Sequence, residues 1–142
     1  MAEFVQVPCG NCFAVNRVDR DRTATATCGR CKHALFGHPA ALDDTTFGSY
    51  VERSESPVVV DFWAQWCGPC RMMAPQFEAA AAESKGRVLF AKVDTEAAQQ
   101  TAARFGIRSI PTMIVFSGGR ELARQSGAMS QSQILQWLRS VA

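Results

Sequence analysis

The chain has 142 residues, of which 47% are hydrophobic and 20% are charged. This length suffices for one domain of ordinary size with a small appendage, and the composition supports a real hydrophobic core. The formal net charge of +2 is too small to indicate a nucleic-acid-binding protein. The apolar stretches are far shorter than the roughly 20 residues that a membrane-spanning helix needs, and the first residues lack a signal-peptide pattern. We therefore expect a cytoplasmic protein that binds neither nucleic acid nor a membrane.

All six cysteines occur as Cys-x-x-Cys pairs. In the cytoplasm thiols are kept reduced, so such cysteines are expected to bind a metal or to catalyse redox chemistry. Four of them lie within residues 1–37, a segment with few large apolar side chains. A segment this short cannot bury enough surface to fold unaided and needs a metal, a bridge or a partner. We predict a small zinc-ribbon-like domain over residues 1–37 and a larger domain over residues 38–142.

The two N-terminal pairs have fifteen residues between them. This is the spacing of a two-knuckle zinc site, and four thiolates would form a closed tetrahedral site with a structural role. Gly10 and Gly29 follow the first cysteine of each pair and are expected to ease the turns. The alternatives are two disulfides, or a ligand role for His33 or His38. The expected ligands are Cys9, Cys12, Cys28 and Cys31.

Residues 38–142 alternate between strand-like and helix-like patterns. This order predicts an α/β fold, with a central mixed, mostly parallel five-stranded sheet flanked by helices. Functional sites in such sheets lie beyond the carboxyl ends of the strands. In chain order, we expect a strand at 40–42, a helix from Asp43 or Asp44 to about 53, a strand at 58–63, a helix at 69–84, a strand at 88–93, a helix at 95–105 closed by Gly106, a hairpin of 112–116 with 121–126, and a final helix capped by Ser130.

The third pair, Cys67-Gly68-Pro69-Cys70, comes after the apolar strand at 58–63 and begins a helix. The amino end of a helix carries partial positive charge and free N–H groups, which stabilise a thiolate. The second cysteine lies one turn further along the same face, within the range that a disulfide can bridge. The pattern therefore predicts a reversible dithiol/disulfide switch. The alternatives are a structural metal pair and an inert disulfide.

Five short motifs together resemble the thioredoxin family over residues 38–142. The resemblance implies the thioredoxin fold and protein-disulfide reductase activity, and the two N-terminal pairs are similar to those of zinc-containing thioredoxins, the second bacterial type. One departure is Gln65, which stands where many thioredoxins have proline. The motifs are Asp61-Phe62-Trp63-Ala64, Trp66-Cys67-Gly68-Pro69-Cys70, Lys92-Val93-Asp94, Ile110-Pro111-Thr112 and Gly127-Ala128.

The resemblance also implies catalytic roles. Cys67 would attack a target disulfide, and Cys70 would resolve the mixed disulfide. Asp61 is an acid in an apolar strand, so burial should raise its pKa, and it would accept the proton of Cys70. The family places the residue that matches Lys92 beside this acid.

The intervening pair Gly68 and Pro69 would tune the redox potential. Ile110-Pro111 is expected to be a cis peptide, with the Ile110 backbone next to Cys67. The resemblance implies that Cys67 and Cys70 form the redox-active disulfide. It also implies a flat apolar substrate-binding surface around this disulfide. Its members would be Trp66, Gly68, Pro69, Ile110, Pro111, Gly127 and Ala128.

The partners implied are an NADPH-dependent flavoprotein, thioredoxin reductase, and disulfide-containing protein substrates, with the chain itself a monomer. Two other functions stay open at this point. The zinc segment could dock a partner on a thioredoxin scaffold, or oxidation of the zinc cysteines could make the metal a redox sensor.

Overall fold

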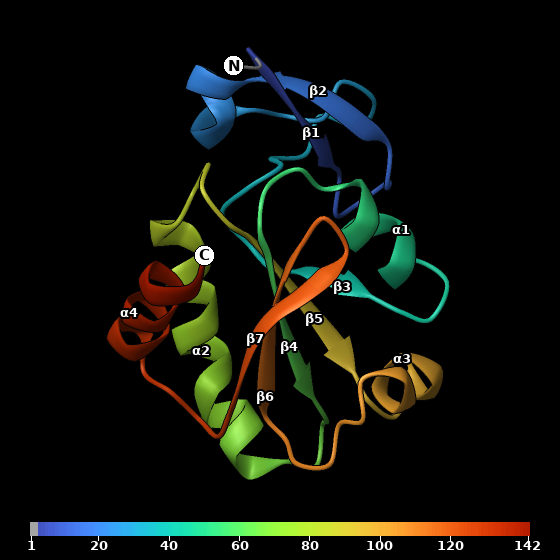
Figure 1. The fold of residues 1–142 in the computed structure, drawn as a ribbon, viewed down its shortest axis with the longest axis vertical. Helices are drawn as coiled ribbons and strands as arrows, with labels where there is room; N and C mark the ends of the chain where they lie inside the picture. Colours follow the sequence, from blue (N-terminus) through green and yellow to red (C-terminus); the bar gives the residue numbers. More distant parts are fainter. Residues whose placement is uncertain (1–2) are drawn as a thin grey trace.

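The computed structural model of the protein describes residues 3–142, which form a two-stranded sheet and a five-stranded sheet. Figure 1 shows the two-stranded hairpin at one end of the molecule and the larger sheet in its middle. The elements are β1 (Phe4–Pro8), β2 (Val15–Asp19), a 3-10 helix (Arg20–Thr25), β3 (Ala40–Leu42), α1 (Phe47–Arg53), β4 (Val58–Trp63), α2 (Gly68–Glu83), β5 (Leu89–Asp94), α3 (Gln99–Arg104), β6 (Thr112–Ser117), β7 (Arg120–Ser126) and α4 (Gln131–Val141).

The large sheet has the strand order β3-β5-β4-β6-β7. β3 and β4 both pair with β5 in parallel, whereas β6 is antiparallel to β4 and to β7. Only β6 therefore runs against the other four strands, and the mixed sheet expected from the sequence is confirmed. β4 lies in the centre and reads as an apolar run because both of its faces are covered.

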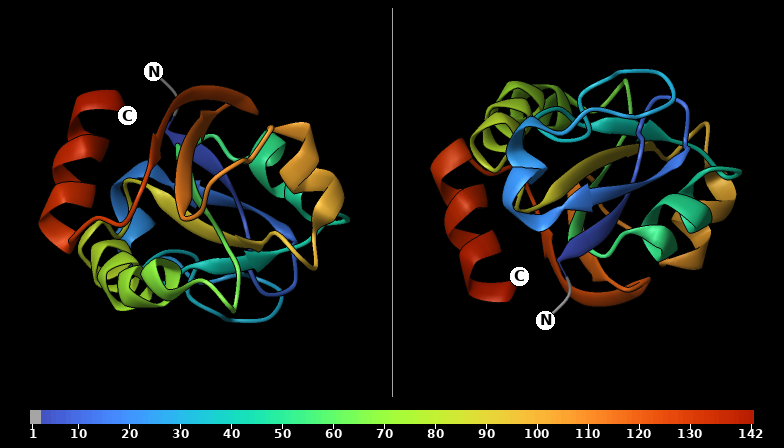
Figure 2. Two further views of the ribbon diagram at one scale, coloured as in Figure 1. Left: turned by 90° about the horizontal axis from the view of Figure 1, so that it is seen from below. Right: turned by 90° about the horizontal axis from the view of Figure 1, so that it is seen from above.

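Helices cover both faces of this sheet, as Figure 2 shows. α2 and α4 share one face, where Phe77 and Ile134 pack with Val59 of β4. α1 lies on the other face, where Phe47 packs against Phe62 with ring centroids 6.5 Å apart. Val59 and Phe62 point to opposite faces because side chains alternate along a strand. None of the helices in residues 3–142 is long and apolar enough to cross a membrane.

The helix expected from Asp43 or Asp44 begins later, at Phe47. The Asp43 side chain accepts hydrogen bonds from the backbone N–H groups of Thr45 and Thr46, at 2.9 and 3.0 Å. This local turn competes with helix formation, which is a known tendency of aspartate. The N-cap of α1 is Thr46, so the prediction that Asp43 or Asp44 caps this helix was wrong, although the helix exists.

The helix expected at 95–105 is also shorter, since α3 begins only at Gln99. The Asp94 side chain accepts from the N–H of Glu96 at 2.9 Å, and so holds a turn after β5. Asp44 reaches across from the other chain segment and accepts from the N–H of Thr101 at 2.8 Å. Two aspartates, Asp94 at the end of β5 and Asp44 just after β3, thus shape loops at the carboxyl edge of the sheet.

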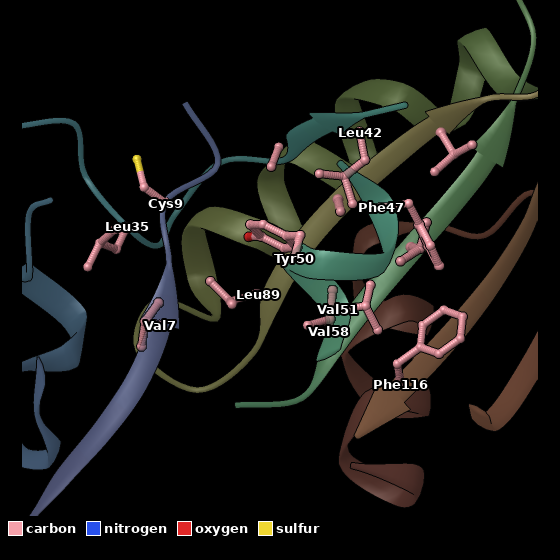
Figure 3. Close-up of a cluster of buried hydrophobic side chains, with 14 of the residues drawn as sticks. Val7, Cys9, Leu35, Leu42, Phe47, Tyr50, Val51, Val58, Leu89 and Phe116 are labelled. Carbon is pink, nitrogen blue, oxygen red and sulfur yellow. The ribbon is translucent and has the colours of Figure 1, made fainter. Parts of the chain in front are cut away.

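The N-terminal segment shares a core with the large sheet. Figure 3 shows Val7 and Leu35 of this segment beside Tyr50 of α1 and Leu89 of β5, and all four are buried in one cluster. Phe13 packs edge-on against Tyr50, with ring centroids 6.3 Å apart. Within the described chain, residues 3–37 therefore contribute to the same hydrophobic core as the large sheet.

Hydrogen bonds reinforce this contact at the amino ends of β4 and β5. The N–H of Glu55 donates to the carbonyl of Gln6 at 3.0 Å, just before β4. Thr23 Oγ1 donates to the carbonyl of Gly86 at 3.0 Å, just before β5. The N-terminal segment thus lies at the amino ends of β4 and β5, at the opposite end of the sheet from their carboxyl ends (Figure 1).

Candidate active site and metal centre

Cys67 and Cys70 form a disulfide at the amino end of α2, with their Cα atoms 5.2 Å apart. Cys67 is the N-cap residue of the helix, and its Sγ accepts a hydrogen bond from the Cys70 N–H at 3.2 Å. Pro69 occupies the first turn of the helix, where a missing N–H costs nothing. An exchange-competent sulfur therefore sits where the helix supplies an N–H donor and partial positive charge.

The loop before β6 lies directly against this dithiol. The Ile110 carbonyl oxygen is 3.8 Å from Cys67 Sγ. The Ile110–Pro111 peptide is cis, as expected from the sequence. The Pro111 carbonyl accepts from the N–H of Gly127 at 2.9 Å, which ties the end of β7 to the same loop. Three segments far apart in the chain therefore meet around Cys67.

Most of the residues expected to contact a substrate form an open surface around the disulfide. The side chain of Trp66 is 65% exposed. Gly68 and Ile110 are half-buried, whereas Pro111 is buried. Both sulfur-bearing residues are almost covered, with Cys67 4% and Cys70 2% exposed. The remaining members, Pro69, Gly127 and Ala128, are all exposed.

Two residues near this surface were not singled out from the sequence. Met72 is 76% exposed one turn after Pro69 on α2. The sequence signal for Met72 is its position: it is an apolar residue three positions after Pro69, in the helix that begins with the dithiol. Glu96 accepts a hydrogen bond from the Trp66 indole N–H at 3.0 Å. Nothing local in the sequence signals this contact, because β4 and β5 bring the two residues together.

Asp61 is fully buried in β4, and neither of its carboxylate oxygens has a hydrogen-bond partner within residues 3–142. Burial raises the pKa of this carboxyl to about 7, against a smaller opposing effect of the Lys92 charge. Lys92 lies opposite Asp61 in the β4–β5 register. Its ammonium lies 4.6 Å from the ring centroid of Trp63. Asp61 shares the α2 side of the sheet with Val59, because side chains two apart on a strand point the same way.

The four N-terminal cysteines converge on one point, and their sulfurs all lie within 4.8 Å of one another. The Sγ atoms of Cys9 and Cys31 are 3.5 Å apart, and those of Cys12 and Cys28 are 3.6 Å apart. Tetrahedral Zn–S bonds of about 2.3 Å place sulfurs about 3.8 Å from each other. The spacing thus fits one tetrahedral metal ion. Neither histidine is part of this cluster in the described chain.

Backbone donors favour thiolates in this cluster. The N–H of Asn11 donates to Cys9 Sγ at 3.3 Å, and that of Arg30 donates to Cys28 Sγ at 3.4 Å. A backbone N–H at His33 lowers the pKa of the Cys31 thiol to about 5 despite burial. Against a backbone N–H at Ala14, burial and hydrogen bonds to neighbouring sulfurs raise the pKa of Cys12 to about 11. Four adjacent thiolates repel one another, so all four ionise together only when a cation balances their charge.

The turns of the two knuckles differ from the expectation about their glycines. The left-handed residues are Phe13 and Lys32, with φ of 64° and 70°, each directly after the second cysteine of its pair. Gly10 and Gly29 are not left-handed. Gly10 has a packing role instead, because a Cβ there would lie 2.5 Å from the Cβ of Ala40 in β3. The absence of a side chain lets the first knuckle approach the large sheet.

A dithiol at a helix amino end, beside a cis-proline loop in a mixed sheet with helices on both faces, defines a thiol–disulfide oxidoreductase. The family model for Thioredoxin matches residues 38–140. The chain therefore belongs to the thioredoxin family.

Curated relatives agree with this assignment. Thioredoxin C-3 of Corynebacterium nephridii is 42% identical over 134 residues, which cover 93% of this chain and 92% of that protein. Thioredoxin 1 of a Nostoc species is 43% identical over 99 residues, covering 70% of this chain and 92% of its own. The thioredoxin of Haemophilus influenzae is 40% identical over 97 residues, covering 68% and 91%. An alignment of 134 residues must include most of the segment before residue 38, so the first relative has a counterpart of that segment.

Proposed function

We propose that this chain reduces protein disulfides, with Cys67 as the nucleophile and Cys70 as the resolving thiol. The observation that carries the proposal is the position of Cys67 at the N-cap of α2, where the Cys70 N–H donates to its sulfur. A helix amino end lowers the pKa of a thiol and so increases the thiolate fraction at neutral pH. Gly68 and Pro69 lie between the sulfurs, where they would tune the stability of thiolate against disulfide.

The reaction proceeds through two exchanges. The Cys67 thiolate attacks one sulfur of the target disulfide, which forms a mixed disulfide and releases one target thiolate. Cys70 then loses its proton, and its sulfur attacks Cys67, which breaks the mixed disulfide and releases the second target thiolate. Two electrons pass from the dithiol to the target, and Cys67–Cys70 is left oxidised.

Asp61 would accept the proton that Cys70 loses, through a water molecule. Its carboxylate has no hydrogen-bond partner in the described chain, and its pKa of about 7 suits an acid that exchanges protons near neutral pH. Lys92, opposite Asp61 in the neighbouring strand, would favour the ionised form. This pair gives a buried proton acceptor beneath the helix that carries Cys70.

The exposed surface around Cys67 would bind the target chain. The half-buried Ile110 presents its carbonyl 3.8 Å from Cys67 Sγ, so an extended segment that pairs with this backbone would bring its disulfide to the nucleophile. Trp66, Pro69, Gly127 and Ala128 would add apolar contact. Thioredoxin reductase that uses NADPH would recharge the dithiol, and the chain would act as a cytoplasmic monomer.

Insulin reduction tests this function directly. With NADPH and thioredoxin reductase, the wild-type chain should reduce insulin disulfides, and Cys67→Ser should reduce none. Glu78→Ala is the control, because it changes an exposed side chain of α2 and leaves all six cysteines in place. Absence of turnover in the wild type, or full turnover in Cys67→Ser, would refute the proposal. Full capture of a partner by Cys67→Ser without turnover would favour a binding module instead.

We further propose that Cys9, Cys12, Cys28 and Cys31 bind one structural zinc ion in a domain formed by residues 1–37. The tetrahedral spacing of their sulfurs and the N–H donors around them support this metal. Four thiolate ligands leave no open position, so the ion would hold the knuckles together without taking part in the reaction.

Metal analysis with a thiol count tests the zinc site. Reduced protein should contain one zinc per chain and two thiols that react rapidly, those of Cys67 and Cys70. Six reactive thiols without zinc would refute the metal site. Release of zinc by mild peroxide, before other damage, would favour a redox sensor over a purely structural ion.

A further inference from the structure

Trp66 combines high exposure with a specific polar contact. Its side chain is 65% exposed, and it directly precedes the proposed nucleophile Cys67. The indole N–H, which is the one hydrogen-bonding group of this side chain, donates to Glu96 Oε2 at 3.0 Å. An ionised carboxylate is a stronger acceptor than a neutral group. The contact therefore defines the orientation of the ring beside the dithiol.

The backbone around Glu96 is itself anchored. Its N–H donates to Asp94 Oδ1 at 2.9 Å, and its carbonyl accepts from Gln99 Nε2 at 3.2 Å. The preceding residue, Thr95, donates from both its N–H and its Oγ1 to the Trp63 carbonyl, at 2.8 and 3.0 Å. The turn after β5 is thus fastened to the end of β4. The backbone of Glu96 is thus held by contacts that do not involve the Trp66 side chain.

We propose that Glu96 is a positioning residue, which holds the Trp66 indole in the orientation that receives a protein substrate next to Cys67. The inference rests on the proposed reductase function and adds a determinant of substrate affinity to it. A free tryptophan ring on the surface would lose torsional freedom when a substrate docks against it. A ring already held by Glu96 avoids this loss, which is the general advantage of preorganised contacts.

The position of Glu96 also separates its effect from the exchange chemistry. Within residues 3–142, its side chain hydrogen-bonds to Trp66 and to neither sulfur of the dithiol. Loss of this carboxylate should therefore weaken substrate binding and leave the electron transfer within the bound complex unchanged. In kinetic terms, KM rises while kcat stays constant.

Steady-state insulin reduction with Glu96→Ala and Glu96→Gln tests the proposal. Glu96→Ala should raise the KM for insulin roughly three- to ten-fold, the range for loss of one hydrogen bond, with kcat unchanged. Glu96→Gln keeps an oxygen that accepts from the indole, so its KM should stay within about two-fold of wild type. Glu78→Ala, an exposed glutamate further along α2, is the control for loss of a surface charge. Reduction of a small alkyl disulfide should be equal in all variants.

The Trp66 indole N–H resonance supplies a readout that does not depend on activity. The resonance is assigned by its absence from the spectrum of Trp66→Phe. The indole proton should exchange faster with water in Glu96→Ala and remain protected in Glu96→Gln. An unchanged resonance, or an unchanged KM in Glu96→Ala, overturns the positioning role. A loss of kcat together with a lowered Tm also overturns it, since that result indicates a structural role. If wild type itself reduces no insulin, the reductase proposal fails, and exchange of the indole proton still decides the contact.

Discussion

The two N-terminal cysteine pairs and the dithiol of α2 share the same local chemistry but have different surroundings. In each pair a backbone N–H two or three residues on donates to the first sulfur: Asn11 to Cys9, Arg30 to Cys28 and Cys70 to Cys67. The chain then reverses after Cys12 and Cys31, but continues as a helix after Cys70. The motif alone therefore does not decide between metal binding and redox chemistry.

The path of the chain after each pair decides how many sulfurs meet. The left-handed residues Phe13 and Lys32 turn each knuckle back, so that two knuckles face each other and four sulfurs converge. Cys67 and Cys70 lie on one helix turn with no other cysteine nearby in the described chain, so they bond to each other. In one region Cys9 and Cys28 are buried in the shared core and the other two cysteines are half-buried against it. In the other region both sulfurs are nearly covered and lie beside an exposed surface.

Loss of a metal ligand should have the largest effect in this comparison. Cys28 is fully buried among the four sulfurs. We expect Cys28→Ser to lose the metal and to lower the free energy of unfolding by roughly 3–5 kcal/mol. Metal content and urea denaturation measure the two effects. Cys70→Ser should keep the metal, so equal metal content in both variants would contradict the division between the two regions.

Asp61→Asn, at the dithiol end, should have a large effect of the opposite sign, because it should raise the free energy of unfolding. Burial raises the Asp61 pKa from 3.8 to about 7 in the folded state, so this state holds the proton more tightly than the unfolded state. The contribution of the Asp61 carboxyl to the free energy of unfolding is therefore fully present below about pH 4 and is lost as pH rises towards 7. Above pH 7, Asp61→Asn should be more stable than wild type by up to about 4 kcal/mol.

Urea denaturation of the oxidised protein between pH 4 and pH 8 measures this difference. Wild type should lose stability over this range relative to Asp61→Asn. Glu78→Gln, which changes an exposed acid of α2, should follow the wild-type profile. Parallel profiles for wild type and Asp61→Asn would show that the burial of Asp61 is not reflected in its ionisation.

Gly10→Ala tests the packing between the first knuckle and the large sheet. The new Cβ would lie 2.5 Å from the Cβ of Ala40, so one of the two chain segments must shift. We expect a loss of roughly 1–3 kcal/mol in the free energy of unfolding. Gly29→Ala is the matched control, because its nearest neighbour, Asn16 Oδ1, would lie at an ordinary 3.7 Å. Equal stability of the two variants would contradict the docking of the knuckle on β3.

Thr23→Val should have the smallest effect. It removes the hydrogen bond from Thr23 Oγ1 to the Gly86 carbonyl and should cost about 1 kcal/mol. Thr25→Val, at an exposed position of the same 3-10 helix, should be nearly neutral. Thermal denaturation compares the stability of the two variants. Insulin reduction at about 25 °C, the temperature to which the energies above apply, should be unaffected in both. A lower rate for Thr23→Val would show that the metal end influences the dithiol.

Long periodic segments were predictable from the sequence. The apolar run of β4, the capping serine of α4 and the hairpin of β6 and β7 depend on local patterns, and all three are confirmed. The starts of α1 and α3 were not predictable, because aspartates at strand ends accept from nearby N–H groups and delay each helix. Propensity along the chain does not include such competition.

The sequence by itself determined the chemistry available to this protein: three cysteine pairs at distinct spacings, an acid within an apolar strand, and the motifs of a family. Only the tertiary structure decided that the first knuckle packs on Ala40, that residues 3–37 join the main core, and that Glu96 meets Trp66. The physical reason is distance along the chain. Local patterns specify turns, caps and faces, whereas contacts between remote segments depend on how the sheet brings its strand ends together.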